Sequence, residues 1–115
     1  LKKMSIIDVC VDKLVHAIKN GVVYKQYCTA LEEIKAVPGL KEQVDELRKL
    51  NYQIQAEGDD INLYDAIDDI DSKMDELCRI PEVNRFLEAE LTLCRQLQSI
   101  DASIHQGIQL DIPDL

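Results

Sequence analysis

The sequence contains no tryptophan and a single phenylalanine, Phe86. Its core must therefore be built from Leu, Ile, Val and Met, which is typical of helical bundles. No apolar run approaches the roughly 18 residues that a membrane span requires. The opening LKKMSII lacks the sustained apolar region and the cleavage site of a signal peptide. We expect a soluble cytoplasmic protein with one domain over residues 1–115, large enough to bury roughly two thirds of its unfolded surface.

The usual catalytic and ligand-binding motifs are also missing. The sequence has no GxxxxGKS/T, no GxGxxG and no GxSxG. Residues 60–65 lack the third ligand and the glycine of a calcium-binding loop. Neither His16 nor His105 has a glutamate three residues before it, as helical di-iron proteins require. We therefore predict no catalytic residue, no cofactor and no enzymatic activity.

Negative charge is plentiful, and it is concentrated in one segment. The net charge is −9, and residues 57–76 contain nine acids and one base, Lys73. Such a segment repels phosphate, which argues against direct binding of nucleic acid. It is either a docking surface for a basic partner or a solvated helix face that keeps the protein soluble.

Apolar residues recur at three- and four-residue steps, and no segment alternates with a period of two. This pattern predicts helices over residues 5–19, 22–36, 40–56 and 81–108, with a further helix after a cap at Asn62. Pro38 and Pro81 each interrupt the helical pattern. We predict an all-α bundle of about five helices, in which each proline joins two antiparallel helices in a hairpin and one more helix precedes them.

The first predicted helix carries an apolar stripe that we expect to face inward. It consists of Ile6, Ile7, Cys10, Leu14, Ala17 and Ile18.

The last predicted helix carries two acids, Glu90 and Asp101, in the middle of its apolar stripe. A carboxylate on a core-facing stripe needs a partner, because an unpaired buried charge costs several kcal/mol or shifts its pKa upward. Glu90 could be a metal ligand or a general acid. The alternative that we adopt makes it a structural buried acid, paired with Arg48, Tyr24 or Tyr27.

The far end of this helix is predicted to meet another subunit. A helix over residues 81–108 is about 40 Å long, whereas a compact chain of this size has a radius of gyration of roughly 13–14 Å. The helix must therefore extend beyond a compact bundle. The predicted interface residues are Cys94, Leu97, Ile100, Asp101, Ile104 and Ile108.

The four cysteines, Cys10, Cys28, Cys78 and Cys94, form no CxxC pair, so the usual zinc and redox spacings are absent. Each falls on or next to the apolar stripe of a different helix. We interpret them as small apolar residues. The alternative is that several converge as metal ligands of an iron–sulfur cluster, in a redox-sensing module.

The sequence resembles the YlbF/YmcA family of bacterial regulators in the run VVYKQYCTALEEIKAVPGLKEQVDELRKLNYQIQ, followed by RIPEVNRFLEAELTLCRQLQSIDASI and IQLDIP. The shared residues are Tyr24, Tyr27, Pro38, Leu40, Asn51, Pro81, Val83, Ala89 and Glu90.

The resemblance implies an all-helical, non-enzymatic protein that works in complexes and is commonly a dimer. It links the chain to control of competence, sporulation and biofilm formation, and to a complex that assists ribonuclease Y in RNA processing. Some members take part in complexes that carry iron–sulfur clusters, but the cysteines here give no match to those ligands. We therefore expect a homodimeric adaptor, with sister family members and ribonuclease Y as further partners, and with no membrane contact.

Overall fold

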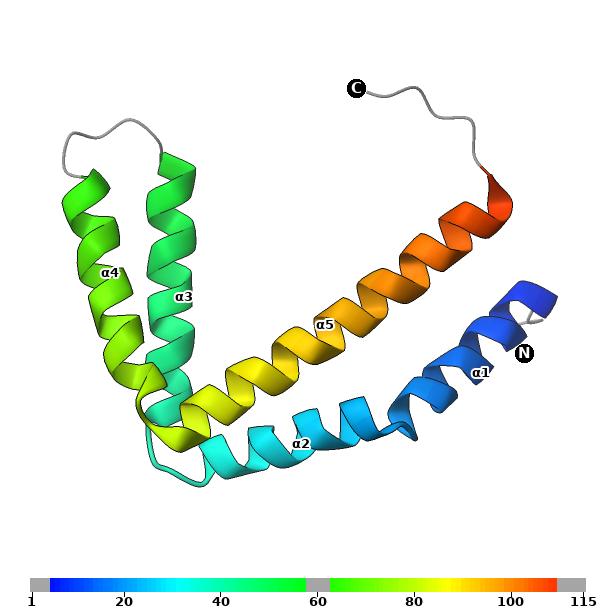
Figure 1. Ribbon diagram of the computed structural model, residues 1–115, viewed down its shortest axis with the longest axis horizontal. Coiled ribbons are helices and arrows are strands. Elements are labelled where there is room, and N and C mark those ends of the chain that lie inside the picture. The colour runs from blue at the N-terminus through cyan, green and yellow to red at the C-terminus, as the bar shows by residue number, and fades with distance from the viewer. Residues whose placement is uncertain (1–4, 58–62, 110–115) are drawn as a thin grey trace. The chain divides into compact units, whose positions relative to one another are not determined.

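The computed structural model describes residues 5–57 and 63–109 (Figure 1). These residues form the helices α1 (Ile6–Lys19), α2 (Val22–Lys35), α3 (Leu40–Glu57), α4 (Leu63–Cys78) and α5 (Pro81–Ile108). The described part of the chain contains no strand, so the all-α prediction is confirmed. Each predicted helix agrees with an observed one to within a residue or two at its ends. The predicted cap at Asn62 lies outside the described residues.

Local chemistry explains where the helices begin and end. The Ser5 hydroxyl accepts a hydrogen bond from the Asp8 backbone N–H at 3.1 Å, and the Asp8 carboxylate accepts one from the Ser5 N–H at 3.2 Å. This reciprocal pair satisfies donors that the first turn of α1 would otherwise leave unbonded. Gly39 has a φ of +76° immediately before α3, a conformation that glycine adopts without steric cost.

The chain divides into two compact units. The 28–88 unit contains the end of α2, all of α3 and α4, and the first turns of α5. The terminal unit contains residues 1–27 and 89–115, of which the structure describes 5–27 and 89–109. Both α2 and α5 run from one unit into the other, and the single domain over residues 1–115 stays a prediction.

The core of the 28–88 unit lies where the prolines interrupt the helices. Its buried residues are Ala30, Ile34, Leu40, Val44, Leu47, Ile70, Val83 and Phe86. Most of them come from the last turns of α2 and the first turns of α3 and α5. The core thus joins helix ends around Pro38 and Pro81.

Phe86 is the largest of the fully buried side chains. The Lys41 ammonium lies 5.3 Å and the Arg48 guanidinium 5.9 Å from the centre of its ring, which is within range of a cation–π attraction. The Arg85 Nε donates a hydrogen bond to the Glu33 carboxylate at 3.1 Å, which joins α5 to α2 inside this unit. Contacts of both kinds therefore hold the ends of α2, α3 and α5 together.

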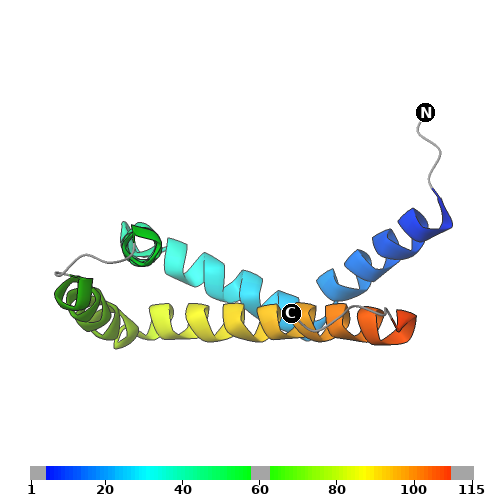
Figure 2. The ribbon, with the colours of Figure 1, turned by 90° about the horizontal axis from the view of Figure 1, so that it is seen from above.

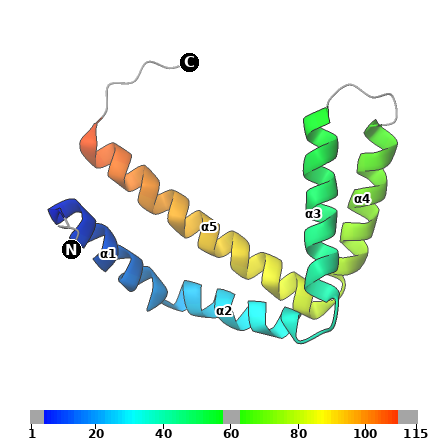
Figure 3. The same ribbon diagram turned by 180° about the vertical axis from the view of Figure 1, so that it is seen from behind.

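The pairing of helices differs from the predicted one. Helices α3 and α4 lie side by side and run in opposite directions (Figures 1 and 3), and Figure 2 views them nearly along their axes. The predicted hairpins paired α2 with α3 and α4 with α5, but at Pro38 and Pro81 the chain of this unit turns without folding back. The apolar residues next to the breaks, Ile34, Leu40 and Val83, are all buried, so the chain buries apolar surface at the ends of these helices.

We predict that Phe86→Ala lowers the free energy of unfolding by about 3–5 kcal/mol, because it removes a fully buried ring and leaves a cavity. Urea denaturation followed by circular dichroism measures the change. Tyr52→Ala is the matched control, since this aromatic side chain is largely exposed, and we expect it to cost less than about 0.5 kcal/mol. Equal losses for the two variants would contradict the assignment of Phe86 to the core.

Candidate functional site

The stripe of α5 changes from buried to exposed along the helix. In the 28–88 unit, Val83 and Phe86 are buried. In the terminal unit, Leu97 is 46%, Ile104 48% and Ile108 62% exposed. The sequence pattern is the same throughout the helix, so what changes is the presence of a covering surface.

The other predicted interface residues also lie wholly or partly at the surface of the chain. Cys94 and Asp101 are exposed, and Ile100 is half-buried. The Asp101 carboxylate lies 3.5 Å from the His105 Nε2, one turn further along the helix. The structure thus leaves this face open to solvent, and its contact with another subunit stays a prediction.

Helix α1 presents a second exposed apolar stripe. Ile6 is 84% exposed, and the helix contains no buried residue. The expectation that Ile6, Ile7, Cys10, Leu14, Ala17 and Ile18 face inward is therefore wrong in the chain by itself, where only Ile18 is half-buried. An amphipathic helix buries its stripe only against a second apolar surface, and the described chain does not cover this one. The three- and four-residue spacing of this stripe is the signal from which α1 could have been predicted to lie at an interface.

Glu90 is half-buried. Of its three predicted partners, Tyr24 and Tyr27 are half-buried as well, and Arg48 lies over the ring of Phe86. The role of Glu90 as a structural acid stays a prediction, which the variant described at the end of this section tests.

The four cysteines are free thiols in two different settings. Cys10 and Cys94 are exposed, whereas Cys28 and Cys78 are half-buried. The interpretation as buried apolar residues is therefore wrong for Cys10 and Cys94. Within residues 5–57 and 63–109, no group of three or more His, Cys, Asp or Glu is placed to hold a metal ion. The iron–sulfur alternative stays a prediction.

The acidic side chains of the segment are exposed wherever the structure describes them. On α4 the exposed acids are Asp65, Asp68, Asp69, Asp71, Asp75 and Glu76. The one base of the segment, Lys73, forms an ion pair with Asp69 at 3.1 Å. Residues 58–62 of the segment lie outside the described residues.

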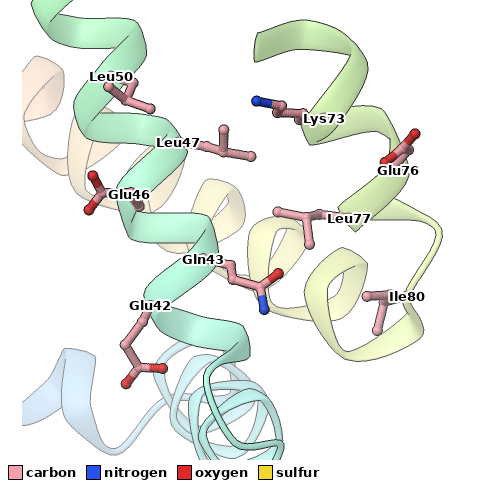
Figure 4. A pocket seen from close by; sticks show the side chains of 9 residues that line it. All are labelled: Glu42, Gln43, Glu46, Leu47, Leu50, Lys73, Glu76, Leu77 and Ile80. Atoms are coloured by element: carbon pink, nitrogen blue, oxygen red, sulfur yellow. The ribbon is translucent and has the colours of Figure 1, made fainter. Parts of the chain in front are cut away.

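A groove runs between α3 and α4 inside the 28–88 unit (Figure 4). Its apolar lining residues, which we call its floor, are Leu47, Leu50, Leu77 and Ile80. Its polar lining residues, which we call its rim, are Glu42, Gln43, Glu46, Lys73 and Glu76. We call this feature the α3/α4 groove; its volume is about 730 Å³. The sequence analysis missed it, because the groove depends on a pairing of α3 with α4 that the hairpin prediction did not contain.

None of the helices in the described part of the chain combines the length and the apolar composition that crossing a bilayer requires.

Comparison with known proteins identifies a family. The family model described as "Control of competence regulator ComK, YlbF/YmcA" matches residues 8–109. The match begins in α1 and ends directly after α5, so it spans both units. No curated protein and no solved structure matches the chain significantly.

We predict that Glu90→Gln lowers the melting temperature by about 4–8 °C, because an amide is a weaker acceptor than a carboxylate for the Arg or Tyr donors that we expect to pair with Glu90. Differential scanning calorimetry measures the shift. Glu42→Gln is the matched control, since Glu42 is exposed on α3, and we expect it to change the melting temperature by less than about 2 °C. An unchanged melting temperature for Glu90→Gln would instead indicate a role at an interface.

Proposed function

The chain belongs to the YlbF/YmcA family, described as control of the competence regulator ComK, and we propose that it is a non-enzymatic helical adaptor of the cytoplasm. It acts through protein–protein complexes in the control of competence, sporulation, biofilm formation or RNA processing. The regulatory description of the family supports this reading, and so does the absence of a catalytic motif from the sequence.

The observation that carries the proposal is the exposed apolar stripe of α5 beyond Ala89. Fully burying a Leu or Ile side chain contributes about 1.5–3 kcal/mol, and Leu97, Ile104 and Ile108 each leave about half of that contribution unused. A neighbouring protein that covers the stripe recovers this free energy. Contiguous apolar surface of this kind marks protein interaction sites.

A second copy of the chain is the first partner that fits this stripe. A symmetric dimer brings the same surface of both copies together, so an apolar stripe meets an apolar stripe. Asp101 also faces this surface, and its charge is offset by His105 when that imidazole is protonated. Sister members of the family share the helical pattern and can use the same face, and ribonuclease Y is the proposed partner of the assembled complex.

We predict that the protein sediments as a dimer, and that Ile104→Asp weakens dimerisation at least about tenfold, because it places an unpaired charge in an apolar contact. Analytical ultracentrifugation over a range of concentrations measures both. Leu91→Asp is the matched control, since Leu91 is equally exposed on α5 but lies off the stripe, and it should leave dimerisation unchanged. A monomer mass at every concentration of the unaltered chain would rule the dimer out.

The adaptor role is tested by affinity purification from native lysate, scored for ribonuclease Y and for sister family members. We expect the unaltered chain and Leu91→Asp to retain them and Ile104→Asp to lose them. If the unaltered chain retains neither ribonuclease Y nor a sister family member, the proposed adaptor role is contradicted.

A further inference from the structure

The floor of the α3/α4 groove is apolar along both of its sides. Leu47 and Leu50 are three residues apart on α3 and so lie on one face of that helix, whereas Leu77 lies in the last turn of α4 and Ile80 in the short connection between α4 and α5. Figure 4 shows Leu47 and Leu77 pointing toward one another across the groove. Leu50 is 38% exposed and Ile80 is half-buried. Two antiparallel helices thus leave an open apolar channel between them.

The rim of the groove is negatively charged. Glu42 and Glu46 lie one turn apart on α3, and Glu76 stands on α4. Lys73 is the only base among the lining residues, and its charge is already offset by Asp69 at 3.1 Å. A ligand in the groove therefore meets apolar side chains below and carboxylates at the edges.

We propose that the α3/α4 groove binds a basic amphipathic helix of a different protein. An amphipathic helix seats its apolar residues, spaced by three and four, in a groove of this kind. Lysine or arginine residues beside that stripe then meet the three rim glutamates, which favours encounter and fixes orientation. The inference rests on the proposed adaptor function and names the chemistry of one of its partners.

Charge argues against a second copy of this chain as the occupant. Acids equal or outnumber lysines and arginines in each of the helices α1 to α5. A helix of this chain would therefore bring no net positive charge to the rim. A phosphate-bearing partner, whether nucleic acid or membrane surface, is repelled by the same carboxylates. The observations favour a basic protein segment.

The test uses a labelled synthetic peptide with leucine at alternating three- and four-residue steps and lysine at most other positions. Fluorescence anisotropy measures its binding to the full chain. One control peptide has the same composition in scrambled order, and another has glutamate in place of lysine. We expect the striped basic peptide to bind at least about tenfold more tightly than either control. Equal binding of the scrambled peptide, or no binding of the striped one, overturns the proposal.

Matched variants of the chain locate the binding surface. The double variant Glu46→Lys with Glu76→Lys should weaken binding of the striped peptide about tenfold, because it replaces two attractions with two repulsions. The control Glu32→Lys with Asp71→Lys makes the same change in net charge at exposed residues that do not line the groove, and it should leave the affinity within about twofold. Equal weakening by the two double variants would mean that net charge alone attracts the peptide, and it overturns the proposal.

Two leucine-to-serine variants test whether the apolar floor contributes to peptide binding. Leu50→Ser should weaken peptide binding about fivefold, whereas Leu91→Ser, at an exposed leucine outside the groove, should have no effect. Circular dichroism of each variant checks that the helices are retained.

The outcome is distinguishable from failure of the proposed function. A peptide that does not bind, together with retention of ribonuclease Y or sister members in the affinity purification, contradicts the groove proposal alone. Loss of the dimer in the double variant Glu46→Lys with Glu76→Lys, but not in its control, would identify a second copy as the occupant and overturn the proposal.

Discussion

Burial of the apolar side chains Ile34, Val44, Val83 and Phe86 is the constraint on which the 28–88 unit depends. These side chains come from α2, α3 and α5, in the turns next to the breaks at Pro38 and Pro81. Because the core lies at helix ends, it holds one end of α3 firmly and leaves the remainder of α3 to pack against α4. The α3/α4 groove lies along this packing, and its floor includes the core residue Leu47.

The features that could be predicted from the sequence are those that neighbouring residues determine. Ser5 with Asp8 and Pro81 set helix ends through local bonds or a missing donor, and the four- and three-residue steps between Leu40, Val44 and Leu47 coincide with the buried face of α3. Contacts between residues far apart in the sequence were less predictable. The stripe of α1 has the same period as a buried stripe, yet Ile6 is exposed, because periodicity shows that a face is apolar and not what covers it. The sequence analysis also missed the pairing of α3 with α4, because a proline break marks a turn without specifying its angle.

The exposed surfaces of the chain are of two kinds, and they suit different partners. The stripe of α5 beyond Ala89 is apolar, with one acid that lies beside a histidine. The α3/α4 groove combines an apolar floor with three glutamates. Apolar contact supplies most of the free energy of association, while charge discriminates between partners. In the proposed assembly, the stripe with little charge therefore binds its own copy, and the acidic groove binds a basic segment.

Charge is also expected to keep the two proposed contacts, at the α5 stripe and in the α3/α4 groove, separate from one another. A second copy could in principle place an amphipathic helix in the groove, because α1 and α5 both have suitable apolar spacing. Specificity is a difference between affinities, and unpaired like charges lower the affinity for the wrong partner. Since every helix of the chain is neutral or acidic overall, self-insertion brings carboxylates toward Glu42, Glu46 and Glu76 without compensating cations. Under the groove proposal, the net charge of −9 therefore contributes to the choice of partner as well as to solubility.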